Sequence, residues 1–298
     1  MNLIIDGNNL AYRCFWISNK SDEQLVTSYG QNVGCVYVFL NSIKSYMRTF
    51  NTNSVYVAWD KKLTYPSSNF RKTLSTGQYK SNRPQENKED LYNQIKIIED
   101  ILPSLGIKNV YPNIMEGDDV IAYLADTLPG NNIIISVDQD LVQLISPSTF
   151  FYNLNKKKLI DLKNFEEEIG VKFESFVLYK SIMGDNSDNI SGLFRYGKVK
   201  SKKLAENWET DKSILSAEQL AIIETNRQMV DLRYGYKYYP DEVKSYTEQL
   251  SKLTDIKPDL DRFKEYCQKY EFKSHQTQLN EWSNLLKQST NLADLFTK

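Results

Sequence analysis

Residues 116–140 read EGDDVIAYLADTLPGNNIIISVDQD, and this stretch indicates the fold class. Its first half carries apolar residues at the spacing of one helix face, namely Val120, Ile121, Leu124, Ala125 and Leu128. Its second half is an apolar, β-branched run, residues 132–137, which is followed at once by Asp138. A helix that leads into a buried strand is typical of an α/β protein with a mostly parallel sheet.

Two more apolar runs outside this stretch end in an acid. Leu3–Ile5 is followed by Asp6, and Ser54–Trp59 is followed by Asp60. In open α/β sheets, ligands bind beyond the carboxyl ends of the strands. We therefore expect Asp6, Asp60 and Asp138 to meet at one edge of the sheet.

Further acids lie in short motifs of the same kind, which are EGDD, SVDQD and MGDNSDN. The complete set is Asp6, Asp60, Glu116, Asp118, Asp119, Asp138, Asp140, Asp185 and Asp188. Each one alone could be a turn residue or a helix cap. As a cluster they need a cation, because two like charges about 4 Å apart repel by roughly 4 kcal/mol at an effective dielectric near 20. The set predicts a divalent-metal site.

The only histidine of the chain is His275, and this excludes several kinds of chemistry. Ser-His-Asp and Cys-His catalysis, or a His-rich metal site, would all depend on that one residue. No motif surrounds it, so we expect a surface or helix-packing role. Oxygen-only ligation favours the hard cations Mg²⁺ and Mn²⁺.

The composition, 41% hydrophobic and 25% charged over 298 residues, is that of a soluble globular protein. No apolar run approaches ~18 residues, and the N-terminus lacks the pattern of a signal peptide. Three widely spaced cysteines, Cys14, Cys35 and Cys267, argue against a disulfide framework and a zinc site. We expect a monomeric cytoplasmic protein that does not contact membranes.

Basic residues are concentrated in two blocks although the net charge is only −1. Residues 61–88 hold seven lysines and arginines with Glu86 as the one acid, and residues 195–203 hold five and no acid. Both blocks flank acidic motifs. Basic surfaces beside a metal site suit a nucleic acid, although two solvated surface stretches would look the same.

Strand signals fade after about residue 165. Before that point, Val33–Phe50 has a helical pattern, and Phe150–Asn153 with Lys158–Asp161 reads as a short hairpin or edge pair. Lys61–Gln85 is polar and is expected to be mobile, with a helix at Glu86–Leu102. The C-terminal part is expected to be helical, with helices at 211–232, 259–273 and 278–287.

Five stretches together resemble the structure-specific 5′ nucleases, a family that includes flap endonucleases, the 5′ nuclease domain of bacterial DNA polymerase I and phage RNase H. They are IIDGNNLAYR, FRKTLSTGQYKSNRP, EGDDVIA, SVDQDLVQL and YKSIMGDNSDNISGL. They occur in the family's order between residues 3 and about 205. The resemblance implies a PIN-like α/β nuclease domain, residues 1–177, with a helical arch at about 61–100. It also implies a helical DNA-binding domain, residues 178–298, with a helix–hairpin–helix element at about 184–206.

The resemblance also implies a mechanism with two Mg²⁺ ions, for which Mn²⁺ is an alternative. Asp6, Asp60, Glu116, Asp118 and Asp138 with Asp140 map onto the inner metal positions. Asp119, Asp185 and Asp188 map onto positions that hold the second metal or its waters. The implied activity is 5′-to-3′ exonuclease and flap endonuclease action on branched or nicked DNA and on RNA primers annealed to DNA, in replication or repair.

Contacts to the nucleic acid follow from the same motifs. Lys80 and Arg83 match basic residues that reach the reacting phosphate from the arch, and Arg71 is expected to steer the strand. Tyr79 is expected either to stack on a terminal base or to pack under the arch.

The hairpin residues GLFRYGKVKSK imply a grip on duplex phosphates through Gly192, Gly197, Lys198, Lys200 and Lys202, with K⁺ as a further expected ion. Here the chain departs from the family, which usually has glycine at Arg195 and a β-branched residue at Tyr196.

Other functions remain open at this point. A PIN-type endoribonuclease has a similar acid cluster. A non-catalytic DNA-junction binder would keep the basic surfaces. A small-molecule phosphohydrolase would leave the basic surfaces without a role. A single-strand binding protein or a sliding clamp is a further expected partner.

Overall fold

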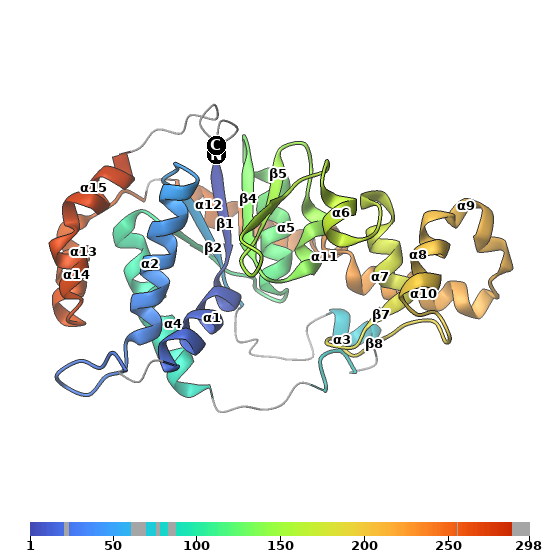
Figure 1. Cartoon of the computed structure of the whole chain (residues 1–298), viewed down its shortest axis with the longest axis horizontal. Coiled ribbons are helices and arrows are strands. Elements are labelled where there is room, and N and C mark those ends of the chain that lie inside the picture. The colour runs from blue at the N-terminus through green and yellow to red at the C-terminus, as the bar shows by residue number, and fades with distance from the viewer. Residues whose placement is uncertain (21–23, 61–69, 76–77, 83–87, 255, 288–298) are drawn as a thin grey trace.

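A six-stranded sheet forms the centre of the molecule (Figure 1). The computed structural model describes residues 1–20, 24–60, 70–75, 78–82, 88–254 and 256–287. The strands are β1 (Asn2–Asp6), β2 (Ser54–Ala58), β3 (Lys108–Val110), β4 (Asn132–Ser136), β5 (Thr149–Asn153) and β6 (Lys158–Ile160). Their order is β3-β2-β1-β4-β5-β6, and only the β5–β6 pair is antiparallel.

The strand order reverses between β1 and β4. The chain proceeds from β1 to β2 and β3 on one side, then crosses back through helix α5 (Gly117–Thr127) to β4 on the other side. Such a switch point leaves a crevice beyond the carboxyl ends of the two strands, where ligands bind in open α/β sheets. Asp6 ends β1 at this crevice, and Asp138 follows β4.

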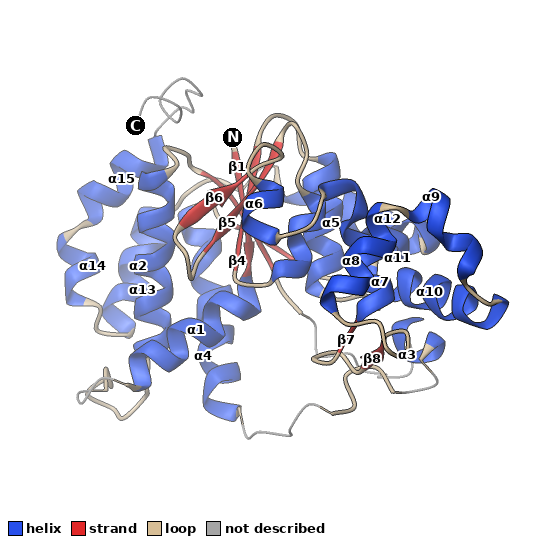
Figure 2. Cartoon of the chain, turned by 45° about the vertical axis from the view of Figure 1, so that its right-hand side comes forward, coloured by secondary structure: helices blue, strands red, loops and turns tan. Residues whose placement is uncertain are grey.

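Both faces of the sheet are covered, which explains why its strands read as continuous apolar runs. Leu3 and Ile5 belong to one core, and Ile4 between them belongs to the other. The first core is packed by helices α1 (Gly7–Asn19), α2 (Gly34–Thr49) and α4 (Glu89–Ile101). The second is packed by α5, α6 (Phe165–Ile169), α7 (Phe176–Met183), α11 (Leu232–Tyr238) and α12 (Pro240–Leu253) (Figure 2).

The last three helices, α13 (Leu260–Lys269), α14 (Lys273–Thr277) and α15 (Leu279–Lys287), return to the first core. Phe263, Cys267 and Trp282 are fully or almost fully buried there with residues of α2. Helices α7, α8 (Lys198–Glu206), α9 (Trp208–Asp211) and α10 (Ala217–Val230) form the opposite end of the molecule (Figure 1). The predicted division at residue 177 stays a prediction.

The three long strands and the β5–β6 hairpin expected from the sequence are present. Strand β3 was not expected, because three residues are too few to show an alternating pattern. The helix expected from Glu86 begins at Glu89, and residues 83–87 lie outside the described part of the chain. Helix α12 was not expected either. None of the described helices is long and apolar enough to span a membrane.

The segment expected to be mobile, Lys61–Gln85, lies largely outside the described residues. Two described pieces of it are helix α3 (Phe70–Leu74) and the turn at residues 78–82. Arg83 lies outside the described residues, as do Lys61 and Lys62.

His275 lies in an aromatic cluster under α13–α15 and has no exposed surface. Its ring centroid is 5.2 Å from that of Tyr37 and 5.8 Å from that of Trp282. Its Nδ1 accepts a hydrogen bond from Trp282 Nε1 at 3.3 Å, whereas Nε2 has no partner among the described residues. Burial lowers the pKa of His275 to about 4, and nearby Lys44 adds to the shift. Of the two expected roles, helix packing is the observed one.

Stability should therefore decrease as the pH falls from about 6.5 to about 4, because the unfolded histidine binds a proton that buried His275 does not. A shift of this size corresponds to roughly 3 kcal/mol in the free energy of unfolding. Urea denaturation at pH 7 and pH 4.5 would measure it. His275→Asn keeps an acceptor for Trp282 but cannot titrate, so its stability should depend less on pH. Equal pH dependence in both proteins would contradict the assignment.

Candidate active site

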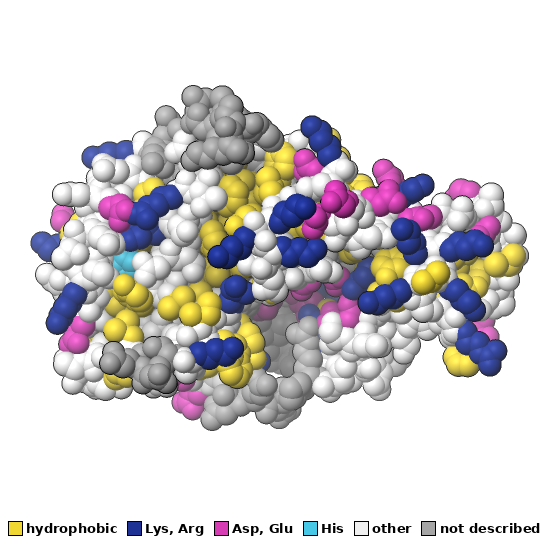
Figure 3. All heavy atoms as spheres, in the orientation of Figure 1, with side chains coloured by type: hydrophobic (Ala, Val, Ile, Leu, Met, Phe, Trp, Pro, Cys, Tyr) yellow, Lys and Arg dark blue, Asp and Glu magenta, His cyan; other side chains and the backbone are white. Residues whose placement is uncertain are grey.

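A pocket of about 350 Å³ opens at the switch point of the sheet, and five carboxylates line it. Asp6 ends β1, Asp60 follows β2, Glu116 and Asp118 begin α5, and Asp138 follows β4; all five line the pocket. In Figure 3, acidic side chains are visible in a hollow near the middle of the face shown. The structure thus brings together the acids that the strand ends were expected to deliver.

Short-range contacts fix these acids. The two Asp6 oxygens accept hydrogen bonds from Asn9 N at 3.0 Å and Ser136 Oγ at 2.8 Å. Asp60 Oδ1 accepts one from Gly117 N at 2.7 Å, which ties the end of β2 to the start of α5. A Cβ on Gly7 would lie 2.7 Å from the Trp59 ring, so the glycine after Asp6 allows the start of α1 to lie against the end of β2.

The pocket favours binding of a cation. Burial, and after it the charges of Asp60 and Asp138, raise the pKa of Asp6 to about 7 against the hydrogen bonds it accepts. Burial also raises the pKa of Asp118, and repulsion from Asp138, Asp6 and Asp60 adds to the shift. Carboxylates that repel one another this strongly fit a hard divalent cation, which would hold them ionised.

Within the described residues, no three acidic, cysteine or histidine side chains are close enough together to hold a metal ion directly. Mg²⁺ commonly keeps several waters and binds through one or two carboxylates. The donor set fits such a water-rich site, and the metal-binding role of each acid stays a prediction.

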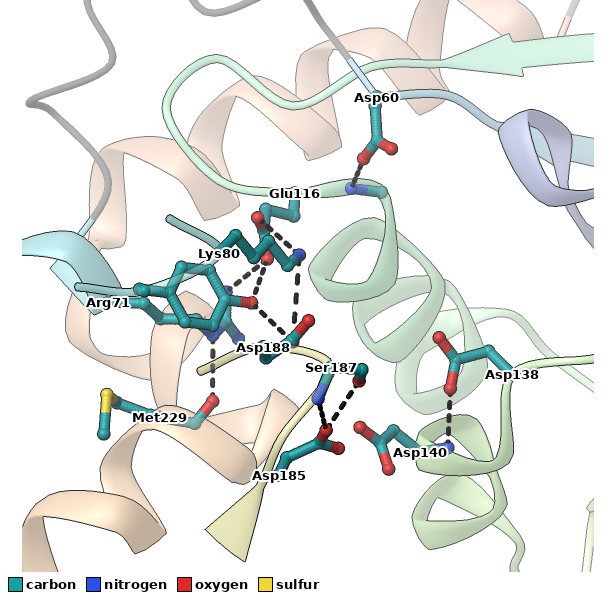
Figure 4. A network of polar contacts seen from close by, with 12 residues as sticks. Asp60, Arg71, Lys80, Glu116, Asp138, Asp140, Asp185, Ser187, Asp188 and Met229 are labelled. Carbon is teal, nitrogen blue, oxygen red and sulfur yellow. Dashed lines mark hydrogen bonds and ion pairs between the residues drawn. The ribbon is translucent and has the colours of Figure 1, made fainter. Parts of the chain in front are cut away.

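Lys80 reaches the pocket from the segment that follows α3 (Figure 4). Its Nζ donates to Glu116 Oε1 at 2.8 Å and lies 4.0 Å from Asp188 Oδ2. Its backbone N–H donates to the carbonyl of Asp188 at 2.9 Å. Burial alone would raise the pKa of Glu116, but Lys80 and Arg71 outweigh it and lower this pKa to about 2.

Tyr79 is buried beside the same acids, with 4% of its surface exposed. Its hydroxyl lies 2.9 Å from Glu116 Oε2 and 3.1 Å from Asp188 Oδ2, and it can donate to one of them at a time. The structure therefore places Tyr79 in the packed position, which was one of its two expected roles. Stacking on a base stays a prediction.

Arg71 and Asp119 form a buried ion pair behind the pocket and do not line it. Arg71 is 1% exposed and Asp119 is fully buried. Two hydrogen bonds of 2.8 and 2.7 Å join the guanidinium to the two carboxylate oxygens, and Arg71 Nε donates to the carbonyl of Met229 at 2.9 Å. Asp119 Oδ2 also accepts from Glu116 N at 3.0 Å. In this position the pair holds the backbone of Glu116 in place. The roles expected from the sequence were different, namely strand steering for Arg71 and metal binding for Asp119.

A second acid group lies beside the pocket but does not line it. Lys180 Nζ lies 2.8 Å from Asp140 Oδ1 and 2.6 Å from Asp185 Oδ2. Asp185 Oδ1 accepts hydrogen bonds from the backbone N–H and hydroxyl of Ser187 (Figure 4). Burial raises the pKa of Asp140 to about 6 against the attraction of Lys180.

Helices α7 and α8 flank a small hairpin of strands β7 (Gly184–Asp185) and β8 (Ile190–Ser191). A Cβ on Gly192 would lie 2.0 Å from the Met183 carbonyl oxygen, so only glycine fits there. Gly197 is the N-cap of α8, and a Cβ there would meet nothing within 4 Å. Lys198 and Lys200 are exposed, whereas Lys202 is half-buried and lies 3.7 Å from Glu206.

Comparison with known proteins places the chain in a family. The family described as "5'-3' exonuclease, N-terminal resolvase-like domain" matches residues 1–170. The chain belongs to the 5′-3′ exonuclease family. A 5′-3′ exonuclease of Buchnera aphidicola is 30% identical over 218 residues, which are 71% of this chain and 72% of that protein. One of Aquifex aeolicus is 29% identical and covers 91% of this chain and 92% of that protein.

Solved structures agree on the fold of this 5′-3′ exonuclease family member. The T5 5′-exonuclease with bound zinc superimposes with a TM-score of 0.64 at 21% identity, over 86% of this chain and 98% of that chain. Flap endonuclease-1 from Methanococcus jannaschii gives 0.60 at 14% identity, over 96% and 92%. The predicted fold class, a PIN-like mostly parallel sheet flanked by helices, is confirmed. The predicted class of activity, a 5′ nuclease, is confirmed by family membership.

The pocket-lining side chains of Tyr12, Lys88 and Tyr92 were not expected from the sequence. Neither was Lys180 of this 5′-3′ exonuclease family member, which pairs with two of the expected acids. It stands inside YKSIMGD, one of the stretches that indicated the family, five residues before Asp185. A cation on the last turns of a helix that leads into an acidic loop is a usable signal. The sequence pattern indicated the acids of this loop but not the cation that pairs with them.

Arg71→Met should be strongly destabilising in this protein, because it leaves Asp119 buried without its partner. We expect a loss of roughly 3–5 kcal/mol in the free energy of unfolding. Urea denaturation followed by circular dichroism would measure it. The double variant Arg71→Met with Asp119→Leu removes both charges and should recover much of the loss. A single variant as stable as the wild type would show that the pair does not hold α3 in place.

Proposed function

We propose that this chain is a Mg²⁺-dependent 5′-to-3′ exonuclease and flap endonuclease that hydrolyses phosphodiester bonds in branched or nicked duplex DNA and in RNA primers annealed to DNA. One observation carries the proposal: five carboxylates from three strand ends and one helix start line a single pocket, and Lys80 faces them. Support comes from relatives named 5′-3′ exonucleases and from the T5 enzyme, whose structure contains zinc.

Asp6, Asp60, Glu116, Asp118 and Asp138 would hold the metal, and Asp140, Asp185 and Asp188 would hold a second ion or its waters. Two divalent ions, when bound, supply an activated water and neutralise the charge on the scissile phosphate. The fixed hydrogen bonds to Asp6 and Asp60 keep these carboxylates aimed at the pocket before substrate arrives. Such preorganisation avoids reorganisation during the reaction.

Lys80 would bind the reacting phosphate. Its amino group already lies at the pocket wall, paired with Glu116 at 2.8 Å, and a phosphate oxygen entering the pocket would compete for it. Arg83 would act with it, and its position lies outside the described residues. The lysines of α8 would hold the duplex part of the substrate away from the pocket, with K⁺ a further candidate ion at the hairpin.

A PIN-type endoribonuclease is the nearest alternative, since it would use a similar acid cluster. The helix–hairpin–helix arrangement of α7, β7, β8 and α8 favours a duplex over a plain RNA strand. Cleavage of a 5′-flap DNA, a nicked duplex and an RNA-primed duplex, each compared with single-stranded RNA, distinguishes the two. Binding to all branched substrates without metal-dependent cleavage would favour a junction-binding protein.

Asp138→Asn should abolish most cleavage while keeping substrate binding, because it removes one negative charge that the metal needs. We expect a loss of at least about 10²-fold in single-turnover rate with Mg²⁺, of the size that follows removal of an electrostatic catalytic group. Quenched-flow digestion of an end-labelled flap would measure it. Asp100→Asn, an exposed acid on α4, is the matched control and should cleave normally. Wild-type cleavage by Asp138→Asn would sink the metal assignment.

Lys80→Ala should slow the cleavage step more than it weakens binding, since the lysine contacts the reacting phosphate. The comparison needs single-turnover rates and dissociation constants for the same flap substrate. Lys96→Ala, an exposed lysine on α4, serves as control. An unchanged single-turnover rate would remove Lys80 from the chemistry and leave it a partner of Glu116 alone.

A further inference from the structure

The loop between β8 and α8 ends in a tight, well-anchored turn. Leu193 is 4% exposed, and its N–H donates to the Ile182 carbonyl at 2.8 Å. Three residues later, Tyr196 N–H donates to the Leu193 carbonyl at 3.0 Å and the Tyr196 ring packs against the same small core. Residues 193–196 therefore form a four-residue turn whose two ends are fixed and whose two central residues form the tip.

The tip carries Phe194 and Arg195 as one stacked unit. Phe194 is 81% exposed, and the Arg195 guanidinium lies 5.1 Å from the centre of its ring. Arg195 has a φ of 66°, a left-handed conformation that is strained for an L-residue. Glycine would adopt it without that strain. A strained arginine beside an exposed aromatic ring, on a rigid turn, is a basis for a functional hypothesis.

The surroundings of the tip are basic. Residues 195–203 contain five lysines and arginines and no acid. Lys198, Lys200 and Lys203 are exposed on α8, directly after the turn. Figure 3 shows basic side chains spread over this end of the molecule, on the right of the view. This basic surface favours binding of a polyanion. Because the exposed Phe194 ring lies within it, the surface favours a polyanion that also offers apolar surface.

We propose that the Phe194–Arg195 tip enters the minor groove of the duplex part of the substrate, while the exposed lysines of α8 contact phosphates on either side. The inference rests on the proposed function and adds a contact particular to this chain. A four-residue turn is too small to fill a major groove about 12 Å wide but suits a minor groove of about 6 Å. Arginine is attracted into narrow minor grooves, and apolar side chains there pack on sugars and wedge base steps.

The test compares Phe194→Ala with the wild type by fluorescence anisotropy, with Ca²⁺ in place of Mg²⁺. The probes are a 5′-flap substrate with two helical turns of duplex and a single strand of the flap sequence. We expect the variant to bind the duplex substrate about tenfold more weakly, the scale of losing one aromatic contact to a nucleic acid, with single-strand binding unchanged. Ile214→Ala is the matched control, because Ile214 is also exposed, at 72%, but lies outside the basic block.

Salt dependence separates the two tip residues. Phe194→Ala should leave the slope of log Kd against log salt unchanged, because no charge is lost. Arg195→Gly keeps the left-handed turn while it removes the guanidinium, and should reduce the magnitude of the slope by about 0.9. Phe194→Trp should retain duplex affinity, and thermal melting of every variant checks that the turn remains folded.

Wild-type duplex affinity in a folded Phe194→Ala variant would overturn the tip contact. Equal weakening on single strand and duplex would also overturn it, because the ring would then stack on unpaired bases. Neither result bears on the proposed nuclease function, which fails only if the wild-type protein cleaves no flap, nicked or primed substrate with Mg²⁺.

Discussion

Repulsion among the carboxylates that line one pocket at the carboxyl edge of the sheet is the constraint on which the site depends. Three parallel strands and one helix deliver acids to one pocket, where Asp6, Glu116, Asp118 and Asp138 are half-buried and Asp60 is exposed. Partial burial leaves their mutual repulsion only partly screened by water. Cations from elements outside the sheet offset part of this charge. Lys80 pairs with Glu116, and Lys180 pairs with Asp140 and Asp185. The same charges thus hold the segment after α3 and helix α7 against the sheet edge.

The Arg71–Asp119 pair shows how a site can depend on residues that do not line it. Asp119 Oδ2 accepts from the backbone of Glu116, and the same carboxylate is held by Arg71 on α3. Burying both charges gains little net stability compared with apolar residues, but leaving one unpaired is costly. The pair therefore specifies one position for α3, and with it the position from which Lys80 approaches the pocket.

The sequence predicted the acids of the pocket because β-branched runs ending in aspartate have a direct physical meaning in a parallel sheet. That rule alone places Asp6, Asp60 and Asp138 at one edge of the sheet. It could not place Arg71 or Asp119, since a charged side chain in a motif looks the same whether it faces substrate or a buried partner. For the same reason, the sequence allows two roles for Tyr79, stacking on a base and packing under the arch. Lys180 was not expected because one of its two partners, Asp140, lies in a distant segment of the chain.

The sequence by itself determined the α/β class, the edge of the sheet at which the acids gather, and the family. These follow from local periodicity and from residue types, which short stretches encode completely. Only the tertiary structure decided which charges pair with one another, which helices complete each core, and that Phe194 stands exposed on a strained turn. These depend on contacts between segments far apart in the chain, where burial sets the strength of every electrostatic interaction.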